Sequence, residues 1–381
     1  MDLSITPQQE QLRETITRFA RKELNSDLIE RDRAAAFPHE LWRKCAELGL
    51  CALPFAEEHG GSGYDHLSTV IAIEALSYAC HDSGLVHALL AHLVSGRALE
   101  IFGSPELKQR HFPSICSGEK ILAQGATEAD SGSDLFSMRT RAVRDDDGYV
   151  IDGAKMFVSN GPVADLILAL AVTNPKRKGF GAHSMLLVER ERPGFSSGSA
   201  FEKMGLRTLQ NSELIFEACR VPLGNLVGKE GQGSIIFTEV MDWERIVFGA
   251  CHLGTLSRIL EACVAFAKER KQFGQQIGKF QAVSSKIARM KMNLELGRLM
   301  VYKAAVMKDR GARAPLEAAT IKIFASESLR SAAIDAVQIH GASGYMTETQ
   351  IERELRDSAA STIYSGTVEL NTEIISKLLG L

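Results

Sequence analysis

The order of hydrophobic and polar positions divides the chain into three parts, and the first is helical. Thr6-Pro7-Gln8-Gln9 has the residues of a helix start: a threonine cap, proline at the first helical position and glutamine three residues after the cap. Helical patterning then continues to about residue 118, broken by loops. The first apolar face is formed by Leu12, Ile16, Phe19, Ala20 and Leu24.

The middle part has the pattern of β-strands. Asp147-Gly148 separates two short runs, Arg139–Val143 and Tyr149–Ile151, and this dipeptide is typical of a hairpin turn. Segments rich in proline, glycine and serine separate the other β-like runs. These are Leu166–Val172, Ser184–Val188 and Glu213–Phe216.

Long helical patterns return from Ser234 to the end and include residues 234–270 and 279–310. Helices followed by strands and again by helices indicate an α+β fold rather than a doubly wound sheet, in which the two types alternate. We therefore expect a helical domain at 1–119, a β domain at 120–230 and a second helical domain at 231–381.

Composition narrows the function. The 381 residues carry 44 basic and 47 acidic side chains, a balance that argues against general nucleic-acid binding. The seven cysteines form no Cys-x-x-Cys pair, so neither a zinc site nor a disulfide framework is indicated, and we expect a cytoplasmic protein. The first residues lack the pattern of a signal peptide. Since no uncharged apolar stretch reaches the roughly 18 residues of a membrane span, no membrane partner is expected.

Two segments suggest chemistry. In Gly125–Asp134, small residues and hydroxyls gather where helix gives way to sheet, and such a turn lets N–H groups and hydroxyls approach a polar ring edge. A purely structural loop is the alternative. Glu244 lies well beyond the start of its helix, where capping does not explain it. Phe248 shares its face and Trp243 and Ile246 flank it, so an apolar site would raise its pKa and make it a better base.

Two histidines are the remaining candidates for a site. His87 and His92 are five residues apart, a spacing that does not put them on one helical face as metal ligands. We interpret both as packing or surface residues and expect no metal site.

From end to end the chain resembles the acyl-CoA dehydrogenase superfamily. The segments that carry the resemblance are Gly125–Asp134, Lys155–Gly161, Glu269–Gly274 with Phe280-Gln281, and Gln338–Tyr345. The resemblance implies an N-terminal helical domain, a barrel-like middle β domain, a C-terminal four-helix bundle, bound FAD and a homotetramer. In that family Arg270 would neutralise the pyrophosphate of a neighbouring subunit's FAD. Phe157 and Ser159 stand where tryptophan and threonine are commoner.

The same resemblance implies a set of residues that bind FAD. They are Gln124, Ala126, Thr127, Gly132, Ser133, Phe157, Ser159, Arg270, Phe273, Gln281, Gln338, Ile339, Gly341, Ala342, Thr367 and Glu369.

The catalytic base is expected in an unusual place. Most of the superfamily has a glutamate in the loop that here reads Tyr364-Ser365-Gly366, and a serine hydroxyl is a poor proton acceptor at neutral pH. A minority branch, including isovaleryl-type enzymes, supplies the carboxylate from the position of Glu244. The resemblance therefore implies that Glu244 is the base, that the Ser365 N–H binds the thioester oxygen, and that Arg245 positions or tunes Glu244. A solvent-facing Glu244–Arg245 pair is the alternative.

A narrower resemblance concerns the substrate. Trp243-Glu244-Arg245, Asn160–Asp165 and Tyr364–Thr367 are similar to the prolyl-carrier-protein dehydrogenases of secondary metabolism. This implies that L-proline, held as a thioester on a phosphopantetheine-bearing carrier protein, loses the α-proton to Glu244 and a hydride to flavin N5. The electrons would pass to an electron-transfer flavoprotein or O₂. The chain departs from that pattern at Tyr364, where phenylalanine is usual, and at Glu369 and Asn371, in place of Asp and Gln.

Charge adds weak support for a carrier protein. Segment 268–303 has a basic excess that would attract an acidic partner, although a solvated face with subunit contacts and the FAD pyrophosphate is the favoured explanation. Its basic residues are Lys268, Arg270, Lys271, Lys279, Lys286, Arg289, Lys291, Arg298 and Lys303. Two other functions stay open: a short branched-chain acyl-CoA dehydrogenase of catabolism, and an assembly protein with this fold and no redox role.

Overall fold

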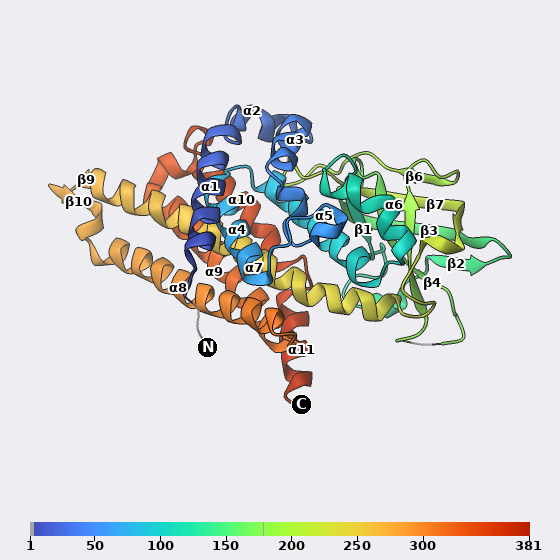
Figure 1. Cartoon of the computed structure of the whole chain (residues 1–381). Helices are drawn as coiled ribbons and strands as arrows, with labels where there is room; N and C mark the ends of the chain where they lie inside the picture. Colours follow the sequence, from blue (N-terminus) through green and yellow to red (C-terminus); the bar gives the residue numbers. More distant parts are fainter. Residues whose placement is uncertain (1–3, 178) are drawn as a thin grey trace.

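The computed structural model describes residues 4–177 and 179–381 and shows three parts in chain order (Figure 1). A β-sheet lies at one end of the molecule, and the long C-terminal helices extend to the other. The predicted α+β class, with helical N- and C-terminal domains around a middle sheet domain, is confirmed. The boundaries at 119/120 and 230/231 stay a prediction.

The N-terminal helices begin as predicted. Thr6 caps α1: its hydroxyl accepts from Gln9 N at 3.2 Å, and Gln9 Oε1 accepts from Thr6 N at 3.0 Å. Ile16, Ala20 and Leu24 on the predicted face are buried. The helices of this part are α1 (Pro7–Glu23), α2 (Leu28–Ala34), α3 (His39–Glu47), α4 (His66–Ala79), α5 (Ser83–Phe102) and α6 (Pro105–Cys116).

The middle part is one mixed sheet. Its strands pair in the order β6-β7-β3-β2-β4-β5-β8, with β1 parallel to β4. The predicted hairpin joins β2 and β3, and β4 has the predicted bounds. The run predicted at Arg139–Val143 is shorter and begins two residues later, as β2, whereas β3, β5 and β7 are longer than predicted, and β1, β6 and β8 were missed. The strands are β1 (Leu122–Gly125), β2 (Arg141–Arg144), β3 (Gly148–Ser159), β4 (Leu166–Val172), β5 (His183–Glu189), β6 (Phe195–Ser197), β7 (Asn211–Pro222) and β8 (Leu226–Val227).

One irregularity of the sheet concerns the predicted site. The register of β3 against β7 shifts between Lys155 and Val158, which is a β-bulge. Phe157 within it has φ 58°, a left-handed conformation that costs a non-glycine residue roughly 1 kcal/mol or more. Bulges redirect side chains. The Phe157 ring accordingly leaves the core and is 62% exposed.

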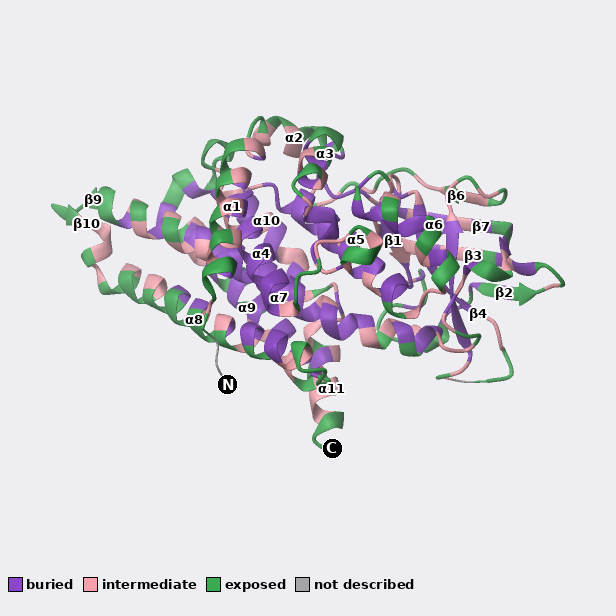
Figure 2. Ribbon diagram, viewed as in Figure 1, coloured by how far each residue is buried: buried purple, intermediate pink, exposed green. Residues whose placement is uncertain are grey.

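The C-terminal part is built around α7, whose residues are largely buried between neighbouring helices (Figure 2). Both α5 and α7 are long and apolar enough to cross a membrane, but 72% and 78% of the residues in their apolar windows are buried inside the protein, as in the core helices of a globular fold. The remaining elements are α7 (Gly233–Glu269), β9 (Lys271–Gln272), β10 (Gln275–Gln276), α8 (Gln281–Asp309), α9 (Pro315–His340), α10 (Ile351–Ser358) and α11 (Val368–Leu378).

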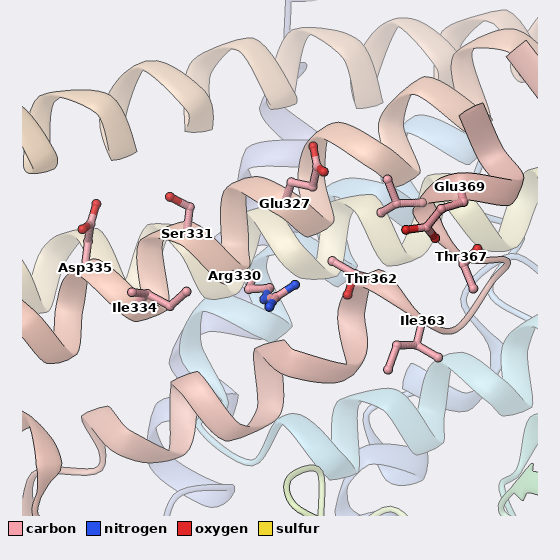
Figure 3. Close-up of a pocket in the computed structure, with 10 residues that line it drawn as sticks. Glu327, Arg330, Ser331, Ile334, Asp335, Thr362, Ile363, Thr367 and Glu369 are labelled. Atoms are coloured by element: carbon pink, nitrogen blue, oxygen red, sulfur yellow. The ribbon is translucent and has the colours of Figure 1, made fainter. Parts of the chain in front are cut away.

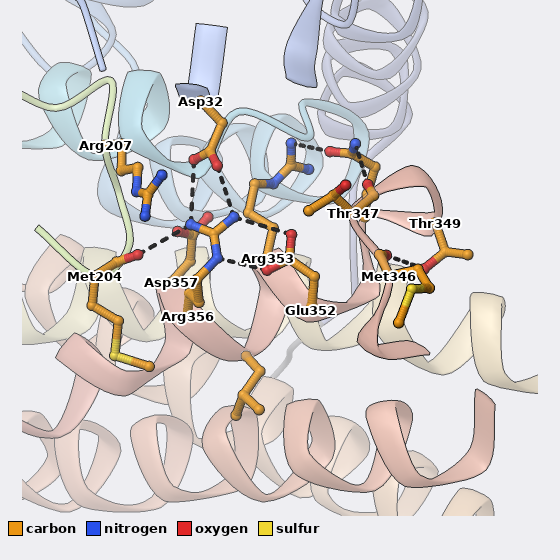
Figure 4. A network of polar contacts seen from close by, with 12 residues as sticks. Asp32, Met204, Arg207, Met346, Thr347, Thr349, Glu352, Arg353, Arg356 and Asp357 are labelled. Atoms are coloured by element: carbon orange, nitrogen blue, oxygen red, sulfur yellow. Dashed lines mark hydrogen bonds and ion pairs between the residues drawn. The ribbon is translucent and has the colours of Figure 1, made fainter. Parts of the chain in front are cut away.

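A polar network ties α10 to the rest of the molecule (Figure 4). Arg356 pairs with Asp32 at 2.7 Å and with Glu352 at 2.6 Å, and it donates to Met204 O at 3.1 Å. Asp357, one residue later, is buried and accepts from Leu206 N at 2.6 Å. These contacts fix α10, and therefore the loop that follows it, against the N-terminal part and the middle domain.

Asp357 makes stability depend on pH. Burial raises its pKa to about 7 from 3.8, against the charge of Arg353 and the bond from Leu206, which lower it. The unfolded chain ionises this carboxyl at lower pH than the folded protein, so its contribution to stability is full below about 3.8 and is lost as the pH rises through about 7.

Replacing Asp357 with asparagine, which keeps an acceptor for Leu206 N, should therefore stabilise the protein more at pH 8 than at pH 4.5. One pH unit corresponds to about 1.4 kcal/mol, so the gain is at most about 4 kcal/mol. Thermal unfolding at both pH values measures it, and the exposed Asp146→Asn is the control. An equal shift of the midpoint at both values would contradict the role of Asp357.

Candidate active site

A hydrogen bond joins Glu244, the predicted base, to Ser365, whose N–H is predicted to bind the thioester oxygen. The Ser365 hydroxyl, in the loop after α10, donates to Glu244 Oε1 on α7 at 2.6 Å. Glu244 is half-buried and Ser365 is buried. Glu244 Oε2 has no hydrogen-bond partner within residues 4–177 and 179–381. The carboxylate is therefore held by one oxygen, and the other is available to take a proton.

The surroundings of Glu244 are apolar, as its neighbours in the sequence predict. Trp243, Ile246 and Phe248 are buried around it. Burial raises the pKa of the Glu244 carboxyl, whereas the bond from Ser365 and the charges of Arg245 and Lys322 lower it. The net effect is a more basic carboxylate than a solvent-exposed glutamate.

Arg245 is also buried, which contradicts the solvent-facing alternative for this pair. Its guanidinium does not bond to Glu244. It binds Asp242 Oδ1 at 3.1 Å and donates to Ser365 O at 3.3 Å. Arg245 was predicted to position or tune Glu244: it donates no hydrogen bond that positions Glu244, but the charge of Arg245 lowers the pKa of the carboxyl. Arg245 also holds the backbone of the loop that carries Ser365.

The loop backbone turns sharply at this point. Ser365 has φ 57° and Gly366 has φ 82°, both left-handed. Asn371 Nδ2 donates to the carbonyls of Gly366 and Thr367, both at 2.9 Å. The Ser365 N–H has no acceptor in the described part of the chain. An unpaired N–H next to Glu244 is the donor expected for a thioester oxygen.

Helix α5 connects this loop to the middle domain. His87 Nε2 lies 2.9 Å from the Tyr364 hydroxyl, and the next residue, Ala88, accepts from Asn160 Nδ2 at 3.0 Å through its carbonyl. Asn160 directly follows Ser159, the end of β3. The end of the Phe157–Ser159 segment and the Tyr364–Ser365 loop therefore contact neighbouring residues of α5, which holds the two segments close together.

A buried ion pair supports the Gly125–Asp134 segment. Lys155 Nζ binds Glu128 Oε1 at 2.7 Å and donates to Ala126 O at 3.2 Å. Glu128 also accepts from the backbone N–H groups of Arg139 and Thr140, at 2.6 and 3.0 Å. Desolvation alone would raise the pKa of Glu128, but these bonds lower it overall, so the carboxylate stays charged.

These residues suit the ring system of a flavin. Phe157 offers an exposed aromatic face beside Ser159, whose hydroxyl accepts from Asn211 Nδ2 at 3.2 Å. Gln124 Oε1 is buried without a hydrogen-bond partner in the described residues. A Cβ added at Gly132 would meet no atom within 4 Å, so the loop there has open space. An aromatic face, unpaired polar atoms and free space fit a planar, polar-edged ring.

A cleft of about 480 Å³ lies beside the loop, between α9 and the start of α11 (Figure 3). Two of the predicted flavin residues, Thr367 and Glu369, line it. Thr367 caps α11 by accepting from Leu370 N at 3.2 Å. Arg330 and this helix N-terminus suit an anion such as a pyrophosphate, although three carboxylates share the cleft: Glu327, Asp335 and Glu369.

Seven of the sixteen predicted flavin residues lie elsewhere. Arg270 caps the end of α7 directly before β9, and Phe273 lies in the turn between β9 and β10, at the opposite end of the molecule from the sheet (Figure 1). His340 stacks on Phe266 with ring centroids 4.3 Å apart, which places the 338–342 segment at that same end. Phe273 is 94% exposed, whereas the Ile339 side chain is buried in the core. The distal group comprises Arg270, Phe273, Gln281, Gln338, Ile339, Gly341 and Ala342.

Sequence reasoning missed several residues of the site. His252 is eight residues after Glu244 on the same face of α7, and that spacing was a usable signal. Lys322 on α9 is buried and donates to Ser361 O at 2.6 Å, a contact that no local sequence pattern predicts. His92 is a packing residue, as predicted: it bonds to Ile115 O and Leu122 N, each at 3.2 Å. His87 instead belongs to the site.

Comparison with known proteins shows the family to which this chain belongs. Profiles described as the N-terminal, middle and C-terminal domains of acyl-CoA dehydrogenase match residues 6–119, 123–219 and 231–380. The chain belongs to the acyl-CoA dehydrogenase family. It is an FAD-dependent dehydrogenase or oxidase, and FAD is its cofactor.

Three relatives of this acyl-CoA dehydrogenase family member are especially similar. A probable acyl-CoA dehydrogenase of Bacillus subtilis (strain 168), YngJ, is 39% identical over 100% of both chains. The crystal structure of the prolyl acyl carrier protein oxidase AnaB has a TM-score of 0.97 and 40% identity, over 99% of this chain and 100% of AnaB. PigA with FAD and proline has a TM-score of 0.97 and 37% identity over 100% of both chains.

Proposed function

We propose that this flavoenzyme oxidises an aminoacyl group, L-prolyl in particular, held as a thioester on a phosphopantetheine-bearing carrier protein of secondary metabolism. The observation that carries the proposal is the Ser365–Glu244 hydrogen bond of 2.6 Å, which sets a carboxylate on α7 beside a loop that has no carboxylate of its own. The similarity to AnaB and PigA supports the choice of acyl group.

In this mechanism Glu244 removes the proton from the carbon next to the thioester carbonyl. Its unpaired Oε2 accepts the proton while Oε1 stays bonded to Ser365. The Ser365 N–H donates to the thioester oxygen as negative charge develops there, an interaction typically worth about 2.7–4 kcal/mol. Bound FAD supplies the two-electron acceptor for the reaction. The residues that would hold it in the same chain are those of the Gly125–Asp134 and Phe157–Ser159 segments with Thr367 and Glu369.

The proposal predicts a pH dependence. Glu244 must be ionised to act as a base, so kcat/KM falls as the pH drops through its raised pKa, above the usual 4.5. Ser365→Ala removes a hydrogen bond that lowers this pKa. The acid limb of the kcat/KM profile should therefore move to higher pH in the variant. A limb that stays in place or moves to lower pH would show that Ser365 does not act on the base.

A second prediction exchanges the two positions. Glu244→Gly combined with Ser365→Glu returns the carboxylate to the loop, where most of the family has it. We expect the double variant to recover turnover that Glu244→Gly alone loses, because the two positions are within hydrogen-bond distance. Stopped-flow flavin reduction measures this. No recovery would argue against interchangeable positions.

The direct test is a mass spectrum of the pantetheine arm. A carrier protein loaded with L-proline should lose two mass units on incubation with the flavoenzyme and its electron acceptor, either an electron-transfer flavoprotein or O₂. An unchanged mass, with the flavin still oxidised, would refute the proposed function.

A second function has its own support. The similarity to YngJ, a probable acyl-CoA dehydrogenase, favours delivery by coenzyme A, and the acyl-CoA alternative that the sequence left open is a short branched-chain acyl-CoA dehydrogenase of catabolism. Under that hypothesis isovaleryl-CoA bleaches the flavin, whereas the prolyl-loaded carrier does not. Measuring both thioesters on the same preparation separates the two functions.

The basic segment 268–303 supports carrier docking less than its composition indicates. Ion pairs within the chain engage part of it: Lys286 with Asp335, Lys291 with Glu295, Arg298 with Glu74, and Lys303 with Glu317. The basic excess is then concentrated near the β9–β10 hairpin, where Lys268, Arg270, Lys271 and Lys279 lie. That position suits FAD pyrophosphate in another subunit better than a carrier protein.

We also propose a homotetramer in which that hairpin reaches the FAD of a neighbouring subunit. The predicted flavin residues of the middle domain and those around the β9–β10 hairpin lie at opposite ends of the molecule, so a second copy is needed to bring them together. Large exposed apolar side chains on α8 and at the end of α11 and its C-cap are suited to subunit contacts. They are Met292, Leu296, Leu299, Leu378 and Leu379. Elution at the size of a monomer with FAD retained would refute the tetramer.

A further inference from the structure

A second polar cluster lies beside Glu244 and has no part in the mechanism above. The Tyr364 hydroxyl lies 2.9 Å from His87 Nε2 on α5 and 2.6 Å from His252 Nε2 on α7. Both histidines are buried, whereas Tyr364 is half-buried. Tyr364 is therefore the most exposed of these three residues.

The direction of the first hydrogen bond follows from His87. Its Nδ1 is 2.7 Å from Ser83 O, and a carbonyl only accepts, so Nδ1 carries the proton. Burial lowers the pKa of His87 to about 4, so the ring is neutral at physiological pH and Nε2 is an acceptor. The Tyr364 O–H consequently donates to His87.

The second bond then has a fixed direction as well. Burial lowers the pKa of His252 well below its usual value, so this ring is also neutral. Since the Tyr364 proton is engaged by His87, the Nε2–H of His252 must donate to the Tyr364 oxygen. A phenol oxygen has two lone pairs. One receives this bond, and the other remains available to a further donor.

The cluster and Glu244 share one wall. Glu244, Phe248 and His252 are spaced by four residues along α7, on one face of the helix. The Tyr364 ring packs on Phe248 with centroids 5.0 Å apart, and Tyr364 directly precedes Ser365. An acyl group whose α-carbon lies at Glu244 therefore meets Phe248 and Tyr364 next. Phe248 has no polar group, so the phenol oxygen is the polar feature of this stretch of wall.

We propose that Tyr364 is a specificity-determining residue whose oxygen, oriented by His87 and His252, accepts a hydrogen bond from an N–H on the acyl group, such as the ring amine of a cyclic aminoacyl thioester. This inference rests on the proposed function. Because the hydroxyl proton of Tyr364 is already bonded to His87, the oxygen can accept a hydrogen bond from a donor group of the substrate but cannot donate one to an acceptor group. An apolar ring of the same shape leaves the oxygen without its third partner.

The test compares two acyl groups of nearly equal shape. L-Prolyl and cyclopentanecarbonyl groups, loaded on the same phosphopantetheine-bearing carrier protein, differ at the ring N–H. The wild-type enzyme should prefer the prolyl thioester in kcat/KM for flavin reduction. Tyr364→Phe should lower this preference by about fivefold to tenfold, the usual effect of one hydrogen bond. His87→Leu should act in the same direction, and His87→Gln, which keeps an acceptor, should have a smaller effect. Tyr64→Phe, in an exposed loop, is the control.

The outcomes separate the two proposals. If Tyr364→Phe slows both thioesters by the same factor, Tyr364 has only a structural role and the inference is overturned, while the proposed function stands. A wild-type enzyme that oxidises both thioesters equally well also overturns the inference. If the wild-type flavin is not reduced by the prolyl carrier at all, the proposed function fails and the inference fails with it.

Discussion

Replacing Glu244 with glutamine should lower the rate constant of flavin reduction by roughly 10²- to 10⁴-fold, the usual contribution of a general base. The amide keeps the shape of the side chain and an oxygen for the Ser365 hydroxyl, which donates to the carboxylate at 2.6 Å. Folding and FAD content should therefore be preserved while the proton acceptor is lost. Single-turnover reduction of the flavin by the thioester isolates this step from the electron acceptor.

The matched control is Glu239→Gln on the same helix. Glu239 pairs with Lys308 at 3.2 Å on α8 and makes no contact with the loop that carries Ser365. Its replacement should leave the rate constant nearly unchanged. A Glu244→Gln enzyme with the rate of the wild type would place the base elsewhere and remove the central step of the mechanism.

Replacing Glu354 with alanine should lower the free energy of unfolding by about 3–5 kcal/mol, because it leaves a buried guanidinium without its counterion. Glu354 on α10 binds Arg258 on α7 through both oxygens, at 2.9 and 3.0 Å, and both side chains are buried. Arg258 also donates to Cys80 O at 2.9 Å. The pair therefore joins α7 and α10 to the end of α4. Because α10 directly precedes the loop that leads to Ser365, the pair also supports that loop.

Two further variants test this explanation. Glu373→Ala breaks an exposed pair with Lys377 on α11 and should change stability by less than about 1 kcal/mol. Arg258→Met combined with Glu354→Leu removes both charges and should recover most of the loss. Thermal unfolding of the holoenzyme compares all four proteins. A Glu354→Ala protein as stable as Glu373→Ala would mean that the buried pair contributes little.

Local patterns determined much of the fold. Thr6, Pro7 and Gln9 specify the start of α1 through contacts within four residues, and the structure has that capping box. The seven residues of β4 form a continuous apolar run, typical of a buried strand, and its bounds agree with the prediction. The predicted desolvation of Glu244 also followed from its neighbours on α7, because residues three and four apart share one face of a helix.

Other features depend on contacts between distant segments. The short strands β6 and β8 have three and two residues, too few for a periodic signal, and they exist because β7 and β5 pair with them. The bulge that exposes Phe157 arises from the register of β3 against β7. No local propensity contains that information.

The sequence by itself determined the three-part α+β order and, through its resemblance to a family, the choice of Glu244, Ser365 and the flavin residues. Only the tertiary structure decided how they meet. It placed Arg245 on Asp242 and the Ser365 carbonyl, brought His87 and His252 to Tyr364, and separated the predicted flavin residues of the middle domain from those around the β9–β10 hairpin. The physical reason is that periodicity fixes the face of one helix or strand, whereas hydrogen bonds across more than a hundred residues depend on how the elements pack.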